Sequence, residues 1–128
     1  MKSSRHIVLL PGDGIGPEVT NAARLVLESV AVRYALELTF EECEFGGAAI
    51  DSVGFPLPPE TLSACKNADG ILMGAIGGPR WDHLKGEERP EGGLLALRSG
   101  LGVFANLRPV SVPASLAHLS VLPPKKVE

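Results

Sequence analysis

An uninterrupted apolar run that leads into a glycine-rich loop and an amphipathic helix restricts the possible folds more than any other feature. Residues 7–10 are Ile-Val-Leu-Leu and include no polar side chain, which is typical of a strand buried on both faces, as in a parallel sheet. After the glycines, Pro17 suits the first turn of a helix, and apolar residues recur at helical spacing from Val19 to Val30. The segment therefore predicts a strand–loop–helix unit, from which parallel α/β sheets are built.

Later segments continue this pattern. Residues 36–41 alternate apolar and polar side chains, which predicts a strand with one face in water, and residues 71–76 predict another buried strand. Helices are expected over about residues 58–66 and about residues 94–101, the second weakened at its start by two glycines. Residues 103–112 suit an extended run, which two prolines would confine to a sheet edge or a linker. The order of elements predicts an α/β fold with a largely parallel sheet flanked by helices.

Composition argues against several functional classes. The 15 acidic and 12 basic residues give a net charge of −3, and the basic residues are scattered, which argues against a nucleic-acid surface. No apolar run reaches the roughly 18 residues of a membrane span, and no signal-peptide cleavage site is recognisable. Cys43 and Cys65 match neither a CxxC motif nor a zinc cluster, so both are expected to be free thiols. We therefore expect a cytoplasmic protein without nucleic-acid or membrane partners.

The glycine loop at residues 11–18 does not match a standard nucleotide-binding fingerprint. A Rossmann loop would need a glycine at position 17, where this chain has Pro17, and the GK[ST] ending of a Walker loop is absent. Backbone N–H groups in a strand-to-helix loop can nevertheless hold an anion. Because glycines also permit a tight turn without any ligand, both a structural and a ligand-binding role remain open.

A second candidate site lies in the helix expected near residue 94. Leu94, Leu95 and Arg98 follow Glu91 by three, four and seven residues and share its helix face, and Arg108 lies ten residues after Arg98. Arginine binds carboxylates through paired hydrogen bonds, and leucines desolvate a hydrocarbon arm. The stripe therefore suits a small carboxylate ligand with a branched apolar arm, although an ordinary amphipathic helix has the same pattern.

Four motifs, taken together, resemble a known enzyme family. They are residues 10–18 (LPGDGIGPE), 45–51 (FGGAAID), 77–82 (GGPRWD) and 104–109 (FANLRP). They are similar to the 3-isopropylmalate dehydrogenases, which belong to the β-decarboxylating dehydrogenases together with the isocitrate and tartrate dehydrogenases. The resemblance covers about the first third of a complete family member. It implies the N-terminal part of an isopropylmalate/isocitrate dehydrogenase-like fold, with residues 1–102 in the first domain and residues 103–128 as a crossover into a second domain.

The resemblance also implies an activity and a set of site residues. The family oxidises 3-isopropylmalate with NAD and decarboxylates it to 2-oxoisocaproate with Mg or Mn, in leucine biosynthesis, and the complete enzymes are homodimers. Arg98 and Arg108 match the arginines that hold the substrate carboxylates. Leu94 and Leu95 match the isopropyl pocket, and Glu91 matches the acidic residue between this pocket and the nicotinamide. The residues that match the cofactor-side loop are Gly78, Pro79, Arg80, Trp81, Asp82, His83, Leu84, Lys85, Gly86, Glu87, Glu88, Arg89, Pro90 and Glu91.

The sequence departs from the family pattern mainly in what it lacks. The family's catalytic Tyr and Lys and its metal-binding aspartates have no counterpart here, so the resemblance places no catalytic and no metal-binding residue in this chain. Isocitrate-type members have polar residues at the positions of Leu94 and Leu95. An apolar pocket would leave the extra carboxylate of isocitrate buried and unpaired, which favours isopropylmalate as the substrate. Gly92 replaces a usual Thr, which is expected to loosen the helix start.

Two functional interpretations remain open. One is an N-terminal fragment of a 3-isopropylmalate dehydrogenase, inactive alone and expected to fold poorly, because an interrupted sheet leaves faces and edges uncovered. The alternative is a non-catalytic remnant that binds small acids, or a part of a tartrate- or isocitrate-type enzyme. Trp81 is expected either to stack on a cofactor ring or to pin its loop. The scattered His6, His83 and His118 are not expected to form a metal site.

Overall fold

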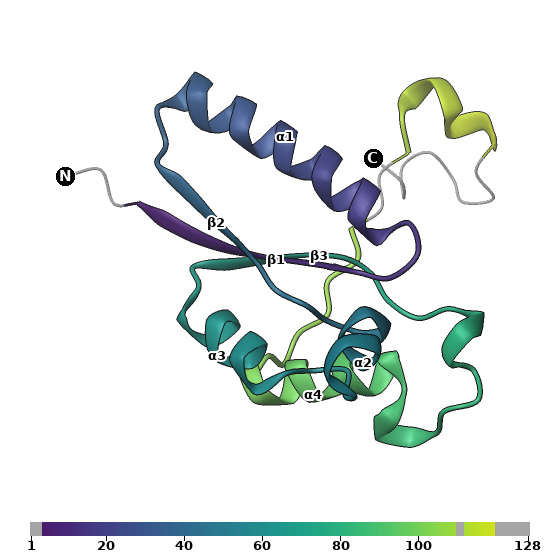
Figure 1. Ribbon diagram of the computed structural model, residues 1–128. Helices are drawn as coiled ribbons and strands as arrows, with labels where there is room; N and C mark the ends of the chain where they lie inside the picture. The colour runs from purple at the N-terminus through teal and green to yellow at the C-terminus, as the bar shows by residue number, and fades with distance from the viewer. Residues whose placement is uncertain (1–3, 110–111, 120–128) are drawn as a thin grey trace.

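The computed structural model describes residues 4–109 and 112–119, and it confirms the expected α/β class. Its centre is a three-stranded, entirely parallel sheet in the order β2-β1-β3. Helix α1 lies along one face of the sheet, and α2, α3 and α4 lie on the opposite side (Figure 1). The elements are β1 (Arg5–Gly12), α1 (Gly16–Tyr34), β2 (Leu38–Glu42), α2 (Gly47–Val53), α3 (Pro59–Asn67), β3 (Gly70–Ala75), the 3-10 helices η1 (Pro79–Trp81) and η2 (Gly86–Glu88), α4 (Pro90–Leu101) and the 3-10 helix η3 (Ala114–Leu119).

Strand β1 is apolar throughout its middle because it lies between two other strands and between two layers of helices. Val8, Leu9 and Leu10 are at most 1% exposed. Val8 pairs with Glu41 of β2 on one side and with Ile71 of β3 on the other. Such two-sided burial leaves no place for a polar side chain, as the sequence pattern predicted.

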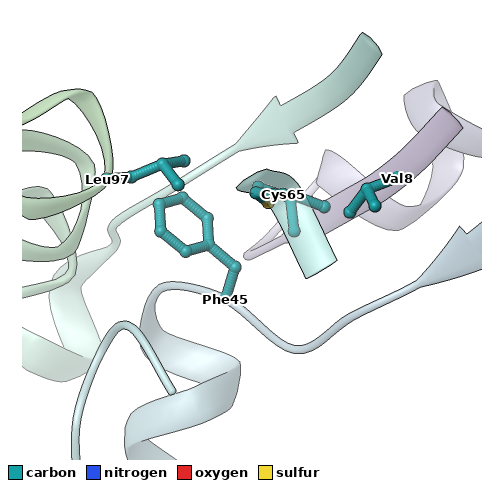
Figure 2. Close-up of a cluster of buried hydrophobic side chains, with 5 residues drawn as sticks. Val8, Phe45, Cys65 and Leu97 are labelled. Atoms are coloured by element: carbon teal, nitrogen blue, oxygen red, sulfur yellow. The ribbon is translucent and has the colours of Figure 1, made fainter. Parts of the chain in front are cut away.

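The hydrophobic core lies between the sheet and the α3–α4 side. Val8, Leu10, Phe45, Cys65 and Leu97 form one buried cluster. Figure 2 shows the fully buried ring of Phe45 directed at Leu97 of α4. Full burial of one such apolar side chain stabilises a fold by roughly 1.5–3 kcal/mol. The cluster therefore fixes α4 against the sheet, and α4 carries most of the expected substrate residues.

Helix α1 has two apolar sides, only one of which is covered. Thr20 and Ala31 are buried where the helix packs on β1 and β3. In contrast, Leu25 and Val26 are 56% and 62% exposed. In the part of the chain that the structure describes, no element covers this outer side.

Three expectations about the elements need correction. Helix α2 was not expected, because its short sequence starts with glycine and has a weak intrinsic tendency to be helical. Helix α4 begins at Pro90, earlier than expected, because proline suits the first turn. Strand β2 begins at Leu38, so Leu36 lies outside it.

Residues 103–109 have no regular secondary structure, which agrees with a linker. Residues 110–111 of the expected extended run, and residues 1–3 and 120–128 of the expected domains, lie outside the described residues.

Candidate functional site

A buried carboxylate, Asp13, joins three segments at the edge of the sheet where the strands end. Asp13 follows β1 and is 4% exposed. Its Oδ2 accepts hydrogen bonds from the backbone N–H groups of Gly47 and Gly77, both at 2.8 Å, and its Oδ1 accepts one from Ala48 at 2.7 Å. Gly47 and Ala48 open α2, so the carboxylate also faces the positive end of that helix. Sequence reasoning missed this role, because its three partners are distant in sequence.

The glycines of the loop after β1 have a structural role. A Cβ atom at Gly12 would lie 2.1 Å from the carbonyl oxygen of Ala75, and one at Gly16 would lie 2.0 Å from that of Pro11. The N–H group of Asp13 donates to the Ala75 carbonyl at 2.7 Å, and that of Gly16 donates to the Asp13 carbonyl at 2.8 Å. These two loop N–H groups are therefore already used within the chain. Glycine is required here for the close approach of the β1 loop to the end of β3.

Trp81 pins the expected cofactor-side loop to helix α2. Its ring lies so close to Gly47 that a Cβ atom there would come within 2.4 Å of the indole. Its Nε1 donates to Asp51 Oδ1 at 3.2 Å, and the guanidinium of Arg80 lies 3.2 Å from Asp51 Oδ2. Of the two roles expected for Trp81, the structure shows the anchoring contact. The start of the loop is thus held at two points, by Trp81 and by the hydrogen bond from Gly77 to Asp13.

The remainder of this loop lies largely at the surface and leads into α4. Arg89 is its most connected residue, and its Nη2 donates a hydrogen bond to Asp82 Oδ1 at 3.5 Å. The Nε of Arg89 lies 3.3 Å from Glu91 Oε2, within ion-pair distance but outside hydrogen-bond geometry. Pro90 is buried and the half-buried residues are Gly78, Trp81, Leu84 and Arg89, whereas the exposed residues are Pro79, Arg80, Asp82, His83, Lys85, Gly86, Glu87 and Glu88. The loop therefore presents mostly polar, solvent-accessible groups.

The expected substrate stripe on α4 is divided between the core and the surface. Leu94 is half-buried and packs against the core cluster. Leu95 is 66% exposed, and Glu91 and Arg98 are exposed as well. Glu91 also lies above Gly77, where a Cβ atom would come within 2.7 Å of Glu91 Oε1. The amphipathic-helix interpretation thus applies to Leu94, while Glu91, Leu95 and Arg98 form an outward face that the core does not use.

Two hollows adjoin this outward face. The larger one has a volume of about 970 Å³ and lies between residues 55–57, the η2 region and α4, with Glu91 and Leu95 in its wall. Arg98 lines a separate hollow of about 470 Å³ with residues 103–107. Arg108 is exposed and lines neither of these hollows. Within residues 4–109 and 112–119, no carboxylate lies within ion-pair distance of Arg98 or Arg108.

The two cysteines are free thiols in protected surroundings. Burial is the main reason that the pKa of Cys65 is raised to about 11, with smaller contributions from Cys43 and Glu41. Burial also raises the pKa of Cys43, and the neighbouring Glu41 adds to the effect. Both groups remain protonated at neutral pH, so they are poor nucleophiles.

The described residues do not fit a metal ion. In residues 4–109 and 112–119, no three His, Cys, Asp or Glu side chains gather in a way that could hold one. His6 lies 3.1 Å from Glu41, and His83 and His118 are exposed. A hard cation such as Mg or Mn needs several oxygen ligands in one place. In the same part of the chain, no helix has both the length and the apolar character that crossing a membrane requires.

Comparisons with known proteins connect this geometry to a family. The family model for isocitrate/isopropylmalate dehydrogenase matches residues 6–128. The chain is 59% identical over 118 residues to the 3-isopropylmalate dehydrogenase of Halalkalibacterium halodurans and 59% identical over 124 residues to that of Bacillus licheniformis. The alignments cover 92% and 97% of this chain but 32% and 34% of those proteins, so the chain spans about a third of their length. The resemblance to 3-isopropylmalate dehydrogenases is confirmed.

Solved structures agree with the sequence comparison. A β-decarboxylating dehydrogenase from Thermococcus kodakarensis is similar with a TM-score of 0.61 and 34% identity, over 77% of this chain and 27% of that one. The isocitrate dehydrogenase from Methylococcus capsulatus is similar with a TM-score of 0.52 and 32% identity, over 59% of this chain and 21% of that one. On sequence and structure together, the chain belongs to the isocitrate/isopropylmalate dehydrogenase family.

Proposed function

We propose that this chain supplies the substrate- and cofactor-side part of the active site of an NAD-dependent 3-isopropylmalate dehydrogenase. The complete enzyme would oxidise and decarboxylate 3-isopropylmalate to 2-oxoisocaproate in leucine biosynthesis, as a cytoplasmic homodimer. Residues 1–102 would belong to its first domain and residues 103–128 to the crossover into its second. The observation that carries the proposal is the outward face of α4, where an exposed leucine, Leu95, lies between the carboxylate of Glu91 and the guanidinium of Arg98.

The apolar character of this face supports isopropylmalate over isocitrate. Leu95 is 66% exposed, whereas Leu97 of the same helix is buried, so the described residues leave Leu95 free for a ligand. A branched hydrocarbon arm would bury this side chain. The additional carboxylate of isocitrate would instead be desolvated without a partner, which costs several kcal/mol.

The charged residues around Leu95 define how such a substrate would be held. Arg98 and Arg108 would bind its carboxylates, because each guanidinium offers paired donors and no described carboxylate neutralises it. Leu94 would contribute its exposed part to the apolar pocket. Glu91 would orient the substrate beside the nicotinamide ring.

The loop over residues 78–91 offers the NAD side of the site. Its start is fixed by Trp81 and Asp13, and a Cβ atom at Gly77 would fill the space that Glu91 now occupies. Bound beside this loop, NAD would supply the acceptor for the hydride of the hydroxyl-bearing carbon. The chain's own contribution is to position substrate and cofactor and to exclude water from the apolar arm. Mg or Mn has no ligand set among the described residues, so we derive no step that involves it.

The test is the formation of NADH by the polypeptide that carries this segment in its source. Its kcat/KM is expected to be on the order of 100-fold higher for 3-isopropylmalate than for isocitrate or tartrate, which corresponds to about 2.7 kcal/mol. Equal or faster turnover of isocitrate would contradict the substrate assignment. No NADH from any of the three would favour the non-catalytic, acid-binding alternative.

A matched pair of variants links this activity to α4. Leu95→Ser should raise the KM for 3-isopropylmalate, since the apolar arm loses its contact. Val32→Ser is the control, because Val32 is 84% exposed on α1, on the other side of the sheet. An equal effect of both substitutions would mean that Leu95 acts through the stability of the fold.

A further inference from the structure

We infer that Phe55 forms a second wall of the apolar subsite, so that the hydrocarbon arm of the substrate lies between Phe55 and Leu95. The inference rests on the proposed function and adds a specificity-determining residue to it. No feature of the sequence pointed to Phe55, which follows α2 in a proline-rich turn.

Phe55 and Leu95 both line the groove of about 970 Å³. Residues 55–57 line one side, and Leu95 and Ala96 of α4 line the other. Gly92 and Gly93 are also in the wall, and their lack of side chains lets Glu87 and Pro56 approach the start of α4 closely. Two apolar surfaces thus face a common space that no described residue fills.

Phe55 is held at this groove without being part of the core. It is 45% exposed, whereas Pro56 and Pro58 beside it are buried. The carbonyl oxygen of Pro56 accepts the N–H of Gly46 at 2.8 Å, and a Cβ atom at Gly93 would lie 2.8 Å from Pro56 Cβ. The backbone next to Phe55 is therefore clamped to both the α2 loop and α4. A large aromatic ring on such a clamped backbone, left half in water, gains contacts when a ligand covers it.

Charge at the same groove sets the direction in which a ligand would lie. Glu91 and Arg89 line it as an ion pair of 3.3 Å, and Arg98 lies in the last turn of α4, outside the groove. A molecule with carboxylates at one end and a branched alkyl arm at the other would direct its charged end toward Arg98 and away from the like-charged carboxylate of Glu91. Its arm would then reach the apolar part of the groove, where Phe55 and Leu95 lie.

The experiment measures two constants in the complete polypeptide, the kcat/KM for 3-isopropylmalate and the inhibition constant of malate, which lacks the arm. Phe55→Ser should lower the kcat/KM for 3-isopropylmalate about tenfold, the effect of losing a contact of methylene size in an apolar pocket. The same substitution should leave the inhibition constant of malate unchanged. Phe55→Leu should restore most of the loss. Val53→Ser is the matched control, because Val53 is 43% exposed nearby but does not line the groove.

The outcomes separate this inference from the proposed function. If the unmodified polypeptide does not turn over 3-isopropylmalate, the proposed function fails and the inference fails with it. If the polypeptide is active and Leu95→Ser impairs it, but Phe55→Ser changes neither constant, only the inference is overturned. It is also overturned if Phe55→Ser weakens malate binding as much as it lowers kcat/KM, since the effect then does not depend on the arm.

Discussion

Replacing Asp13 by Asn tests how the loops of the site are held together. The substitution keeps the shape of the side chain but removes its charge and replaces one acceptor oxygen by an NH2 donor. In the structure, Oδ2 accepts two N–H groups and Oδ1 accepts one. With the amide oxygen in the Oδ2 position, the new NH2 group faces the N–H of Ala48, so two donors meet where a hydrogen bond had been.

The magnitude follows from the burial of this carboxylate. A hydrogen bond to a charged group contributes about 1.5–3 kcal/mol, and one between neutral groups about 1 kcal/mol. The bond from Ala48 is lost and the other two become neutral, which together removes about 4 kcal/mol. Because Asp13 is 4% exposed, water cannot replace the lost acceptor. The local opening equilibrium should therefore shift by roughly 10³-fold.

Hydrogen exchange measures this shift directly. The backbone amides of Gly47, Ala48 and Gly77 should exchange roughly 10³ times faster in the Asp13→Asn polypeptide, if exchange follows local opening. Asp51→Asn is the control, because its partly exposed contacts with Trp81 and Arg80 should contribute less than about 1 kcal/mol. An acceleration below about tenfold at all three amides, or an equal one in the control, would refute the reasoning.

The remaining predictions concern binding, pH and folding. In the complete enzyme, Arg98→Lys should lower kcat/KM roughly 10- to 100-fold, because a lysine cannot reproduce a paired charged hydrogen bond, and an unchanged kcat/KM would remove Arg98 from the site. The raised pKa of Cys65 should reduce stability as pH rises from about 9 to about 11, since the unfolded thiol ionises first; urea titrations with Cys65→Val should show a flatter dependence. Because α1 leaves Leu25 and Val26 largely exposed, the isolated 128-residue chain should fold poorly, and cooperative thermal unfolding of a monomeric sample would contradict this.

The elements predicted best from the sequence are those whose own residues determine the structure that they form. The apolar residues of β1 predicted a central strand, and the structure buries Val8 and Leu10 completely. Helix α2 could not be predicted in this way. It begins at Gly47 after Gly46, which has a left-handed φ of 72°. Its start is held by the carboxylate of Asp13, which lies 34 residues earlier in the chain.

The candidate site, too, could be predicted only in part from the sequence. Helical spacing predicted one shared face for Glu91, Arg98 and the two adjacent leucines, but it could not distinguish the half-buried Leu94 from the exposed Leu95. Which of them faces the core depends on the rotation of α4 against the sheet, and Phe45 and Leu97 set that rotation by packing together. The binding roles of these residues stay predictions until substrate is bound.

The anchoring of Trp81 has a practical consequence. It is the only tryptophan of these 128 residues, and its indole lies on Gly47 and Asp51, away from the buried cluster around Phe45. Selective excitation of this indole therefore gives an optical signal from the loop and not from the interior. Release of the loop from α2 would wet the ring and shift its emission to longer wavelengths, even while the rest of the fold stayed intact. The chain thus contains its own label for following how the loop responds to a nucleotide or an acid.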